Sequence, residues 1–222
     1  MKIVAIGNSA GGVGKTTLSH CLAVAFAEFG KKTLLIDLDP SGDLTFRVGF
    51  ENPRISIVDY FNGLSISDNS FEVTSERFNF IAADKRLAEN LAQDALSKFL
   101  VDLPQIYDLV LLDLPSSISQ PMAIGLTSAD LILAPVRNDL HSLRGYLQVK
   151  SMAPNQSVLA VAIGANTLIP IEELLDETIA HSLDVEKSAA TKVSVLTYLR
   201  SGECAESYRS AGYSILEKLG LE

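Results

Sequence analysis

The stretch GNSAGGVGKTT, residues 7–17, lies between the apolar run Ile3 to Ile6 and a segment of helical periodicity. Apolar residues recur after it on one helical face, at Leu18, Leu22, Ala25, Phe26 and Phe29, before Gly30. A strand, a glycine-rich turn and a helix in this order are typical of a phosphate-binding loop, because backbone N–H groups and the helix N-terminus then converge on one point. The stretch therefore predicts a βαβ unit that begins with a phosphate site.

Short apolar runs alternate with helical patterns along the rest of the chain. We predict strands at residues 2–7, 33–37, 78–82, 108–113, 131–136, 158–165 and, more weakly, 193–196. Unbroken apolar runs such as LVLL and LILAPV favour strands that helices cover on both faces. The pattern predicts an α/β fold, a doubly wound and mostly parallel sheet with helices on both faces. Residues 49–77 are expected to form an irregular excursion within a single domain, residues 1–222.

Composition limits the classes of function. The chain has 222 residues, a formal net charge of −9 and a pI of about 4.8, so any contact with DNA requires a local basic patch. No apolar run approaches the roughly 20 residues that span a bilayer, and the first residues lack the apolar segment of a signal peptide. Cys21 and Cys204 are far apart in the sequence and predict free buried thiols. These features predict a cytoplasmic protein.

The glycine-rich stretch predicts a role for three of its polar side chains. Lys15 is expected to bridge the β- and γ-phosphates, the Thr16 hydroxyl to ligand Mg²⁺, and Thr17 to reach the α-phosphate. The predicted nucleotide contacts are Gly11, Gly12, Val13, Gly14, Lys15, Thr16 and Thr17. The strict pattern G-x-x-x-x-G-K-[ST] has glycine where this chain has Ser9, so the match covers the second half of the loop.

Three aspartates follow two of the predicted strands. LLIDLDP places Asp37 and Asp39 at the carboxyl end of one strand, and YDLVLLDLP places Asp113 at the end of another. Two acids at a strand end are as often a turn or a helix cap. Beside a GKT loop, however, they favour a metal–phosphate centre in which Asp113 holds Mg²⁺, often through water.

These motifs resemble those of the ParA/MinD family of deviant Walker ATPases. AGGVGKTT, DLDP and DLP correspond to the family's three nucleotide motifs. The resemblance continues through residues 107–146 and returns more weakly over residues 198–218. It implies a P-loop ATPase that uses ATP and Mg²⁺, with Asp39 and Lys15 catalytic, and with Asp37, Asp113 and Thr16 around the metal.

The resemblance also implies a cellular role. Family members use slow ATP hydrolysis to time a cycle between an ATP-bound homodimer and a monomer, and an adaptor protein stimulates that hydrolysis. The dimer binds nucleoid DNA without sequence preference, or binds membrane. The implied function is to position or partition a cargo such as a plasmid, a chromosome region or a protein compartment, with a nucleoid-associated location.

Ala10 departs from the family pattern, which has a lysine there that reaches across the dimer. McdA-type carboxysome-distribution ATPases resemble this chain in lacking it. A triphosphate short of one cation needs another, and Lys150 continues the helical stripe of Leu140, Leu143 and Leu147. We predict that Lys150 reaches a nucleotide phosphate, with Arg144 as a second candidate, although a lysine there can equally lie along the helix end with its amine in water. 

The end of the strand VLAVAIGA carries Asn166, which is expected to read the adenine or to be an ordinary turn residue. In the C-terminal part, basic and acidic residues alternate, which is typical of a mixed solvated surface. The family resemblance favours weak, salt-sensitive DNA binding there, with Arg200 and Arg209 as the candidate residues.

Three other interpretations remain open. A membrane-associated, MinD-like role calls for a basic amphipathic tail, whereas SILEKLGLE is short and ends in an acid, so stable membrane insertion is not expected. A metabolic ATP-dependent ligase or kinase on the same fold calls for a further set of catalytic groups, which the sequence does not display. A module that binds ATP without hydrolysing it is disfavoured by Asp39 and Asp113.

Overall fold

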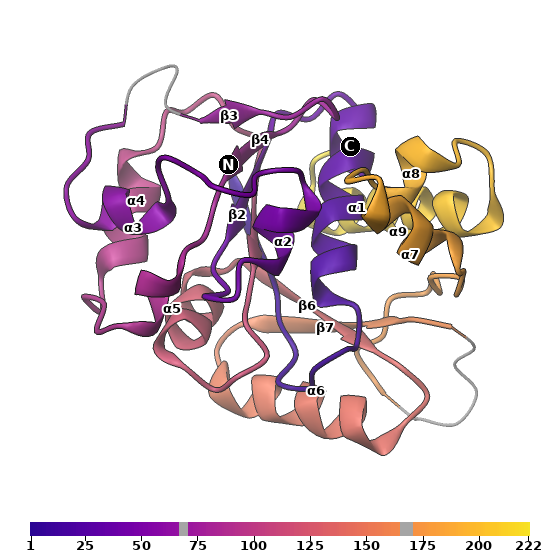
Figure 1. Ribbon diagram of the computed structural model, residues 1–222. Helices are drawn as coiled ribbons and strands as arrows, with labels where there is room; N and C mark the ends of the chain where they lie inside the picture. Colours follow the sequence, from indigo (N-terminus) through magenta and orange to yellow (C-terminus); the bar gives the residue numbers. More distant parts are fainter. Residues whose placement is uncertain (67–70, 165–170) are drawn as a thin grey trace.

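The computed structural model describes residues 1–66, 71–164 and 171–222, and Figure 1 shows their arrangement. Among these residues seven strands form one sheet in the order β3-β4-β2-β5-β1-β6-β7. All neighbours in it are parallel except β3 and β4. The strands are β1 (Lys2–Ile6), β2 (Thr33–Asp37), β3 (Glu72–Val73), β4 (Asn79–Ile81), β5 (Leu109–Asp113), β6 (Leu131–Val136) and β7 (Ser157–Ala162).

Helices cover both faces of this sheet (Figure 1). They are α1 (Lys15–Glu28), α2 (Asp43–Arg47), α3 (Ile57–Phe61), the 3-10 helix η1 (Lys85–Ala88), α4 (Ala95–Asp102), α5 (Gln120–Ser128), α6 (Leu140–Met152), α7 (Asp184–Ala190), α8 (Val195–Tyr198) and α9 (Glu203–Leu219). Alternate residues of the central strands point into two separate cores. One core contains α1, α8 and α9, and the other contains α3, α4, α5 and α6. The predicted doubly wound fold is confirmed.

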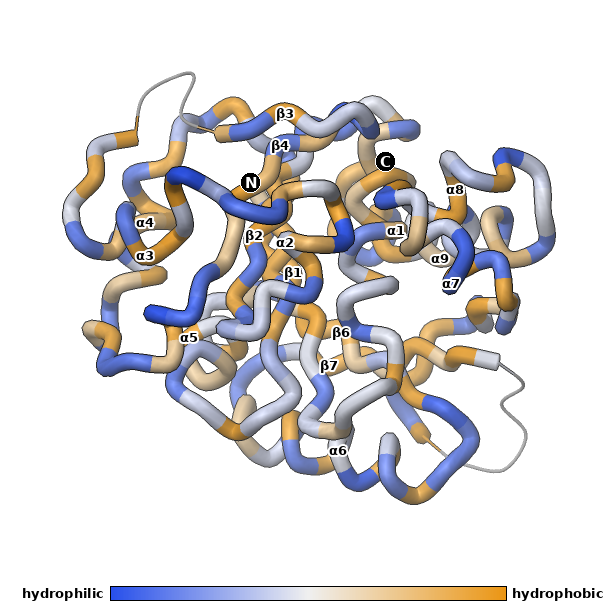
Figure 2. The backbone as a smooth tube through the Cα atoms, viewed as in Figure 1, coloured by the Kyte–Doolittle hydropathy of each residue, from blue (hydrophilic) through white to orange (hydrophobic). Residues whose placement is uncertain are grey.

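The central strands are buried on both faces. All five residues of β2 and of β5, and all six of β6, are buried, as the unbroken apolar runs predict. Hydrophobic residues dominate the inner strands in Figure 2, while blue segments lie mainly around the periphery. No helix among the described residues is long and apolar enough to cross a membrane. The thiols of Cys21 and Cys204 are both free and buried, which confirms that prediction.

Two predicted details of the fold are wrong. Residues 193–196 form no strand, because the Ser194 side chain accepts a hydrogen bond from the Thr197 backbone and begins α8 there. The excursion at residues 49–77 is also less irregular than expected. Ser56 and Asp59 form a reciprocal capping box that starts α3, and β3 adds a short antiparallel edge strand whose two residues are exposed.

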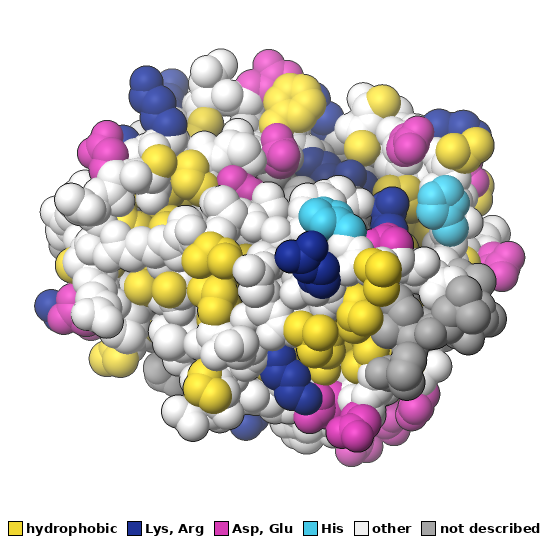
Figure 3. Space-filling model, turned by 90° about the horizontal axis from the view of Figure 1, so that it is seen from below, with side chains coloured by type: hydrophobic (Ala, Val, Ile, Leu, Met, Phe, Trp, Pro, Cys, Tyr) yellow, Lys and Arg dark blue, Asp and Glu magenta, His cyan; other side chains and the backbone are white. Residues whose placement is uncertain are grey.

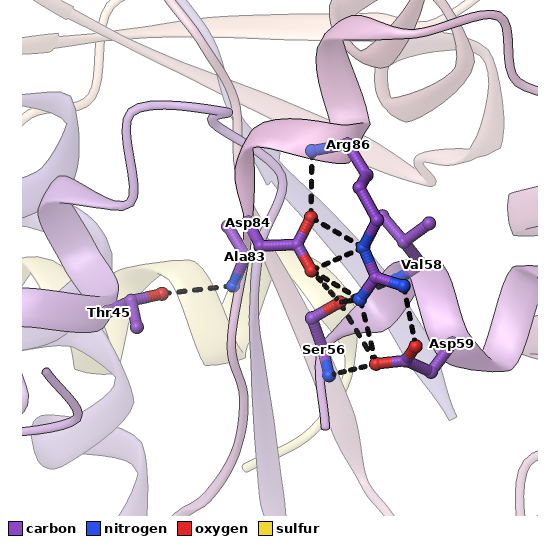
Figure 4. Close-up of polar contacts among 7 residues, drawn as sticks. All are labelled: Thr45, Ser56, Val58, Asp59, Ala83, Asp84 and Arg86. Carbon is purple, nitrogen blue, oxygen red and sulfur yellow. Dashed lines mark hydrogen bonds and ion pairs between the residues drawn. The ribbon is translucent and has the colours of Figure 1, made fainter. Parts of the chain in front are cut away.

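A surface ion-pair cluster fixes the start of α3 against the chain that leaves β4. Arg86 of η1 donates to Asp59 of α3 and to Asp84, and also to the Ser56 hydroxyl (Figure 4). The same chain segment continues inward, where the Ala83 backbone donates to the Thr45 hydroxyl over 3.0 Å. This cluster, made of Ser56, Asp59, Asp84 and Arg86, is called the Arg86 cluster below.

Candidate functional site

The phosphate loop connects β1 to α1. Gly12 and Gly14 have φ angles of 71° and 103°, a backbone conformation that residues with a Cβ rarely adopt. Gly14 caps α1, whose first turn has no acidic residue and no side-chain cap among the described residues. The N–H groups of this turn are therefore left for an external acceptor, which is the arrangement that binds anions.

Lys15 is the buried cation of this loop. Its side chain folds back so that Nζ donates to the Ala10 carbonyl over 2.9 Å, and the residue is 7% exposed. Burial lowers the pKa of Lys15, and the charges of Asp113 and Asp39 act in the opposite direction. The ammonium is thus held inside the loop, close to two of the three predicted carboxylates.

Asp37 and Asp113 lie side by side on neighbouring strands. They are register partners at the carboxyl ends of β2 and β5, and both are buried. Burial, together with the charge of Asp113, raises the pKa of Asp37 to about 8. Burial raises the pKa of Asp113 to about 7, although hydrogen bonds from Ser19 and Thr16 act against it. The fold therefore places two adjacent carboxylates in a site where ionising both is unfavourable without a cation.

The hydrogen bonds of these two aspartates differ. Asp37 accepts from the backbone and hydroxyl of Thr45, at 2.9 and 2.7 Å, and from the Asp39 backbone at 3.0 Å. Asp113 accepts from the Ser19 hydroxyl at 2.7 Å. Asp37 is thus nearly saturated by the turn that follows its own strand, whereas Asp113 keeps more capacity for a ligand.

A pocket of about 530 Å³ lies over the phosphate loop. Its lining includes the loop and Asp39, which is half-buried and accepts from the Ser41 backbone. Ile163, Ala180, Val185 and Ala189 line an apolar part. The lining also includes Arg47, Arg137, His181 and Tyr208. A polar end that binds anions and an apolar wall suit a ligand with a phosphate chain and an organic body.

The described residues hold no cluster of three or more His, Cys, Asp or Glu side chains that would bind a metal by itself. Mg²⁺ does not require one, because it keeps several waters and is bound by one or two protein oxygens together with substrate phosphates. Asp113 and the Thr16 hydroxyl are adjacent oxygen donors of this kind, with Asp37 beside them. The residues present fit magnesium bound together with a phosphorylated ligand.

Ala10 packs beneath α6. It is 2% exposed, and its backbone N–H donates to the side chain of Asn8, which itself donates to the carbonyls of Pro135 and Ser142. A Cβ added to Gly145 of α6 would lie 1.9 Å from Asn8 Oδ1 and 3.0 Å from the Ala10 Cβ. The first half of the loop is thus clamped against α6 by a buried asparagine and a glycine, two residues to which the sequence motif gave no role.

The predicted substitute cations lie on α6, outside the main pocket. Lys150 is half-exposed and forms an ion pair with Glu173, which also accepts from the Tyr146 hydroxyl. The structure does not bring it to the phosphate loop of its own chain, so its contact with nucleotide stays a prediction for a dimer. Arg144 lines a separate depression of about 250 Å³ together with Ser9 and Ala10. Viewed from below, the α6 side of the molecule displays hydrophobic side chains beside basic and histidine side chains (Figure 3).

The two predicted DNA-binding arginines differ in exposure and in their ion pairs. Arg200 is exposed, whereas the Arg209 side chain is 19% exposed and pairs with Glu28 and Glu206. Hydrogen bonding to Glu28 raises the pKa of Arg209.

Asn166 lies outside the described residues. Arg47, Arg137 and Tyr208 line the pocket but were not identified from the sequence, because no motif surrounds them.

Residues 1–158 match a protein-family model described as an AAA domain. The sporulation initiation inhibitor protein Soj of Bacillus subtilis is 28% identical over 187 residues, which are 78% of this chain and 71% of Soj. The chromosome-partitioning ATPase Soj of Thermus thermophilus is 35% identical over 146 residues, 64% of this chain and 57% of that protein. This chain belongs to that family, the ParA/MinD group of Walker ATPases.

Solved structures extend the likeness of this ParA/MinD-family chain to its whole length. MinD of Pyrococcus horikoshii, complexed with Mg-ADP, has a TM-score of 0.86 at 18% identity, covering 99% of this chain and 98% of MinD. An ATP complex of Cyanothece McdA has a TM-score of 0.81 at 18% identity, covering 100% and 97%. Cobyrinic acid a,c-diamide synthase of Mycobacterium smegmatis, with ADP and magnesium, has a TM-score of 0.82 at 23% identity, covering 99% and 96%. At these identities the likeness concerns the fold, and it includes the segment beyond residue 158.

Proposed function

We propose that this protein is an ATPase that binds ATP with Mg²⁺ and hydrolyses it to ADP and phosphate. The observation that carries the proposal is the joint placement of Lys15, Asp39 and the α1 N-terminus in one pocket, beside the buried Asp37 and Asp113. Besides Lys15, four further predicted nucleotide contacts line the same pocket, namely Gly12, Gly14, Thr16 and Thr17. The curated relatives named Soj and the nucleotide-bound solved structures support this function.

In this proposal each group has a defined task. The loop N–H groups and Lys15 bind the phosphates, and Thr16, Asp37 and Asp113 hold the magnesium shell. When bound, Mg²⁺ neutralises charge that develops on the phosphates. Asp39 orients the attacking water for in-line attack on the γ-phosphate, and catalysis comes from positioning and preorganised donors rather than from a covalent step.

Release of phosphate from ATP tests this proposal. We expect slow turnover that requires Mg²⁺ and is lost in Asp39→Ala, while nucleotide binding by that variant persists. Asp102→Ala is the matched control, because Asp102 is exposed and lies at the end of α4, outside the pocket. Equal turnover by wild type and Asp39→Ala would contradict the assigned role.

We further propose that the chain is one domain that dimerises with ATP and positions or partitions a cargo on nucleoid DNA, with an adaptor that stimulates hydrolysis. Helices α8 and α9 lie beyond the family match yet share a core with α1, which supports a single domain. Gel filtration with ATP, with ADP and without nucleotide tests dimerisation. Lys150→Ala should weaken an ATP-dependent dimer if Lys150 contacts phosphate there, and an unchanged dimer would contradict that contact.

DNA binding is expected to be weak and sensitive to salt, because the chain as a whole is acidic. Arg200→Ala should reduce it more than Arg209→Ala, since Arg209 is already paired with two glutamates. The MinD-like alternative predicts binding to anionic vesicles, and a metabolic enzyme predicts turnover that depends on a second small molecule. An ATPase assay with DNA, vesicles or metabolite extracts distinguishes the three.

A further inference from the structure

Arg47, the last residue of α2, is partly buried and takes no part in any ion pair among the described residues. Its Nε and Nη2 atoms are buried and have no hydrogen-bond partner among the described residues. Asp39, Asp43 and Glu186 line the same pocket, yet none of these carboxylates pairs with it. Leaving a charged group buried and unpaired is costly, and a guanidinium cannot lose its proton to avoid that cost.

The position of Arg47 within the pocket is defined by its neighbours. Burial raises the pKa of Cys21 to about 12, and the nearby charge of Arg47 acts in the opposite direction. Burial raises the pKa of the Tyr208 hydroxyl, and the charges of Arg47 and Arg137 act in the opposite direction. Cys21 lies one helical turn after Thr17 on α1, so Arg47 lies over the part of α1 that follows the phosphate loop.

Lys15 has different electrostatic surroundings. The charges that act on it are those of Asp113 and Asp39, at the metal end. Lys15 and Arg47 are thus two of the cationic side chains that line the pocket, with Arg137 a third, and their surroundings differ: Asp113 and Asp39 act on Lys15, whereas the charge of Arg47 acts on Cys21 and Tyr208. A ligand that spans the pocket from the loop to the apolar wall would place different groups at the two positions.

We propose that Arg47 is a ligand-binding residue that pairs with the α-phosphate and ribose end of the nucleotide, the portion that ATP and ADP share. This inference rests on the proposed function. The guanidinium supplies a planar set of N–H donors, which suits phosphate oxygens and ribose hydroxyls. The ligand-free protein keeps the group unpaired, and the ligand provides its partner.

Titration calorimetry with Mg-ADP and with a non-hydrolysable Mg-ATP analogue tests the inference, using the full chain and the variant Arg47→Met. Methionine keeps the apolar stem and removes the charge. We expect Kd to rise about ten- to a hundredfold for both nucleotides, because a hydrogen bond to a charged group contributes this much. Arg54→Met is the matched control, since Arg54 is exposed and lies outside this pocket, and its Kd values should equal those of wild type.

Thermal unfolding of the ligand-free variants separates binding from structure. Because Arg47 Nε and Nη2 have no partner among the described residues, Arg47→Met should unfold at the same temperature as wild type or higher. A lower midpoint or a failure to fold would show that Arg47 stabilises the protein itself and would overturn the inference. Unchanged Kd values, or a change for the ATP analogue alone, would overturn it too. Wild type that bound neither nucleotide would overturn the proposed function instead.

Discussion

The Arg86 cluster and the phosphate site differ in whether their charged side chains are fully paired within the folded chain. Arg86 donates to both Asp59 and Asp84, and this hydrogen bonding lowers the pKa of Asp59 (Figure 4). At the phosphate site, burial raises the pKa values of Asp37 and Asp113 to about 8 and 7. The first cluster is complete in the folded chain, because it contains its own counter-charge.

The second site leaves part of its charge unpaired. Asp37 and Asp113 lie side by side on neighbouring strands, and Arg47 is unpaired among the described residues. A ligand that brings both a divalent cation and phosphates would satisfy all of these groups at once. In this molecule, paired charges stabilise the fold, whereas unpaired buried charges lie where we expect a ligand to bind. Four predictions test this contrast, from the largest expected effect to the smallest.

Lys15→Ala should abolish most nucleotide binding at the incomplete site. Lys15 is expected to donate to two phosphates, so we expect Kd for Mg-ATP to rise by about a thousandfold, or about 4 kcal/mol. Calorimetry measures this directly. Lys98→Ala is the control, because Lys98 is exposed and pairs with Asp94 on the protein surface. A loss of less than tenfold would show that the loop does not hold phosphate through this ammonium.

Glu76→Gln should strongly destabilise the protein by disrupting a third, mostly buried network. Glu76 accepts from His20 and from the hydroxyls of Ser194 and Thr197. Burial by itself would raise the pKa of Glu76, but these hydrogen bonds lower it from 4.5 to about 2. We expect the variant to lose about 3 kcal/mol of unfolding free energy at pH 7, measured by chemical denaturation.

The lowered pKa of Glu76 also predicts how the stability of the protein changes with pH. A lowered carboxyl pKa stabilises the fold above pH 4.5, and that stability is lost as pH falls toward 2. Wild type should therefore lose stability between about pH 5 and pH 2, and Glu76→Gln should lose less over the same range. Glu72→Gln, at an exposed position of β3, should retain the wild-type profile. Parallel profiles for wild type and Glu76→Gln would contradict the assignment.

Arg86→Met should destabilise the protein without affecting the phosphate site. It leaves Asp59 and Asp84 close together with no cation, and these side chains are 29% and 26% exposed. We expect a loss of about 1 to 2 kcal/mol in unfolding free energy, since solvent screens the cluster in part. Nucleotide Kd values should be unchanged, and a tenfold change would show that the two regions are coupled through Thr45 and Asp37.

Asp113→Asn should have the smallest effect on stability. Burial and the neighbouring acids Asp37 and Asp39 oppose ionisation of this carboxylate, and the Ser19 and Thr16 hydroxyls that donate to it can rotate, so its charge does not stabilise the ligand-free fold. We expect unfolding free energy without ligand to stay within about 1 kcal/mol of wild type, or to rise. Magnesium should then no longer strengthen nucleotide binding, as titrations with and without the ion would show. A large loss of ligand-free stability would place Asp113 with the paired groups instead.

Local pattern was sufficient for most of the fold. Buried parallel strands carry unbroken apolar runs, so β2 and β6 were predictable to the residue and β5 to within one residue at its start. The phosphate loop was predictable because backbone geometry, and not a distant contact, requires glycine at Gly12 and Gly14. The prediction for residues 193–196 was wrong because VSVL reads as a strand by composition, while a side-chain cap at Ser194 decides for helix.

The sequence by itself determined the glycine-rich loop, the strand ends that carry Asp37 and Asp113, and the membership in a Walker ATPase family. These features depend on neighbours within a few positions along the chain. Only the tertiary structure decided that Lys150 pairs with Glu173, that Ala10 lies beneath α6, and that Arg47 enters the pocket unpaired. Whether a charge is paired depends on groups brought from distant parts of the chain, and no local spacing encodes those distances.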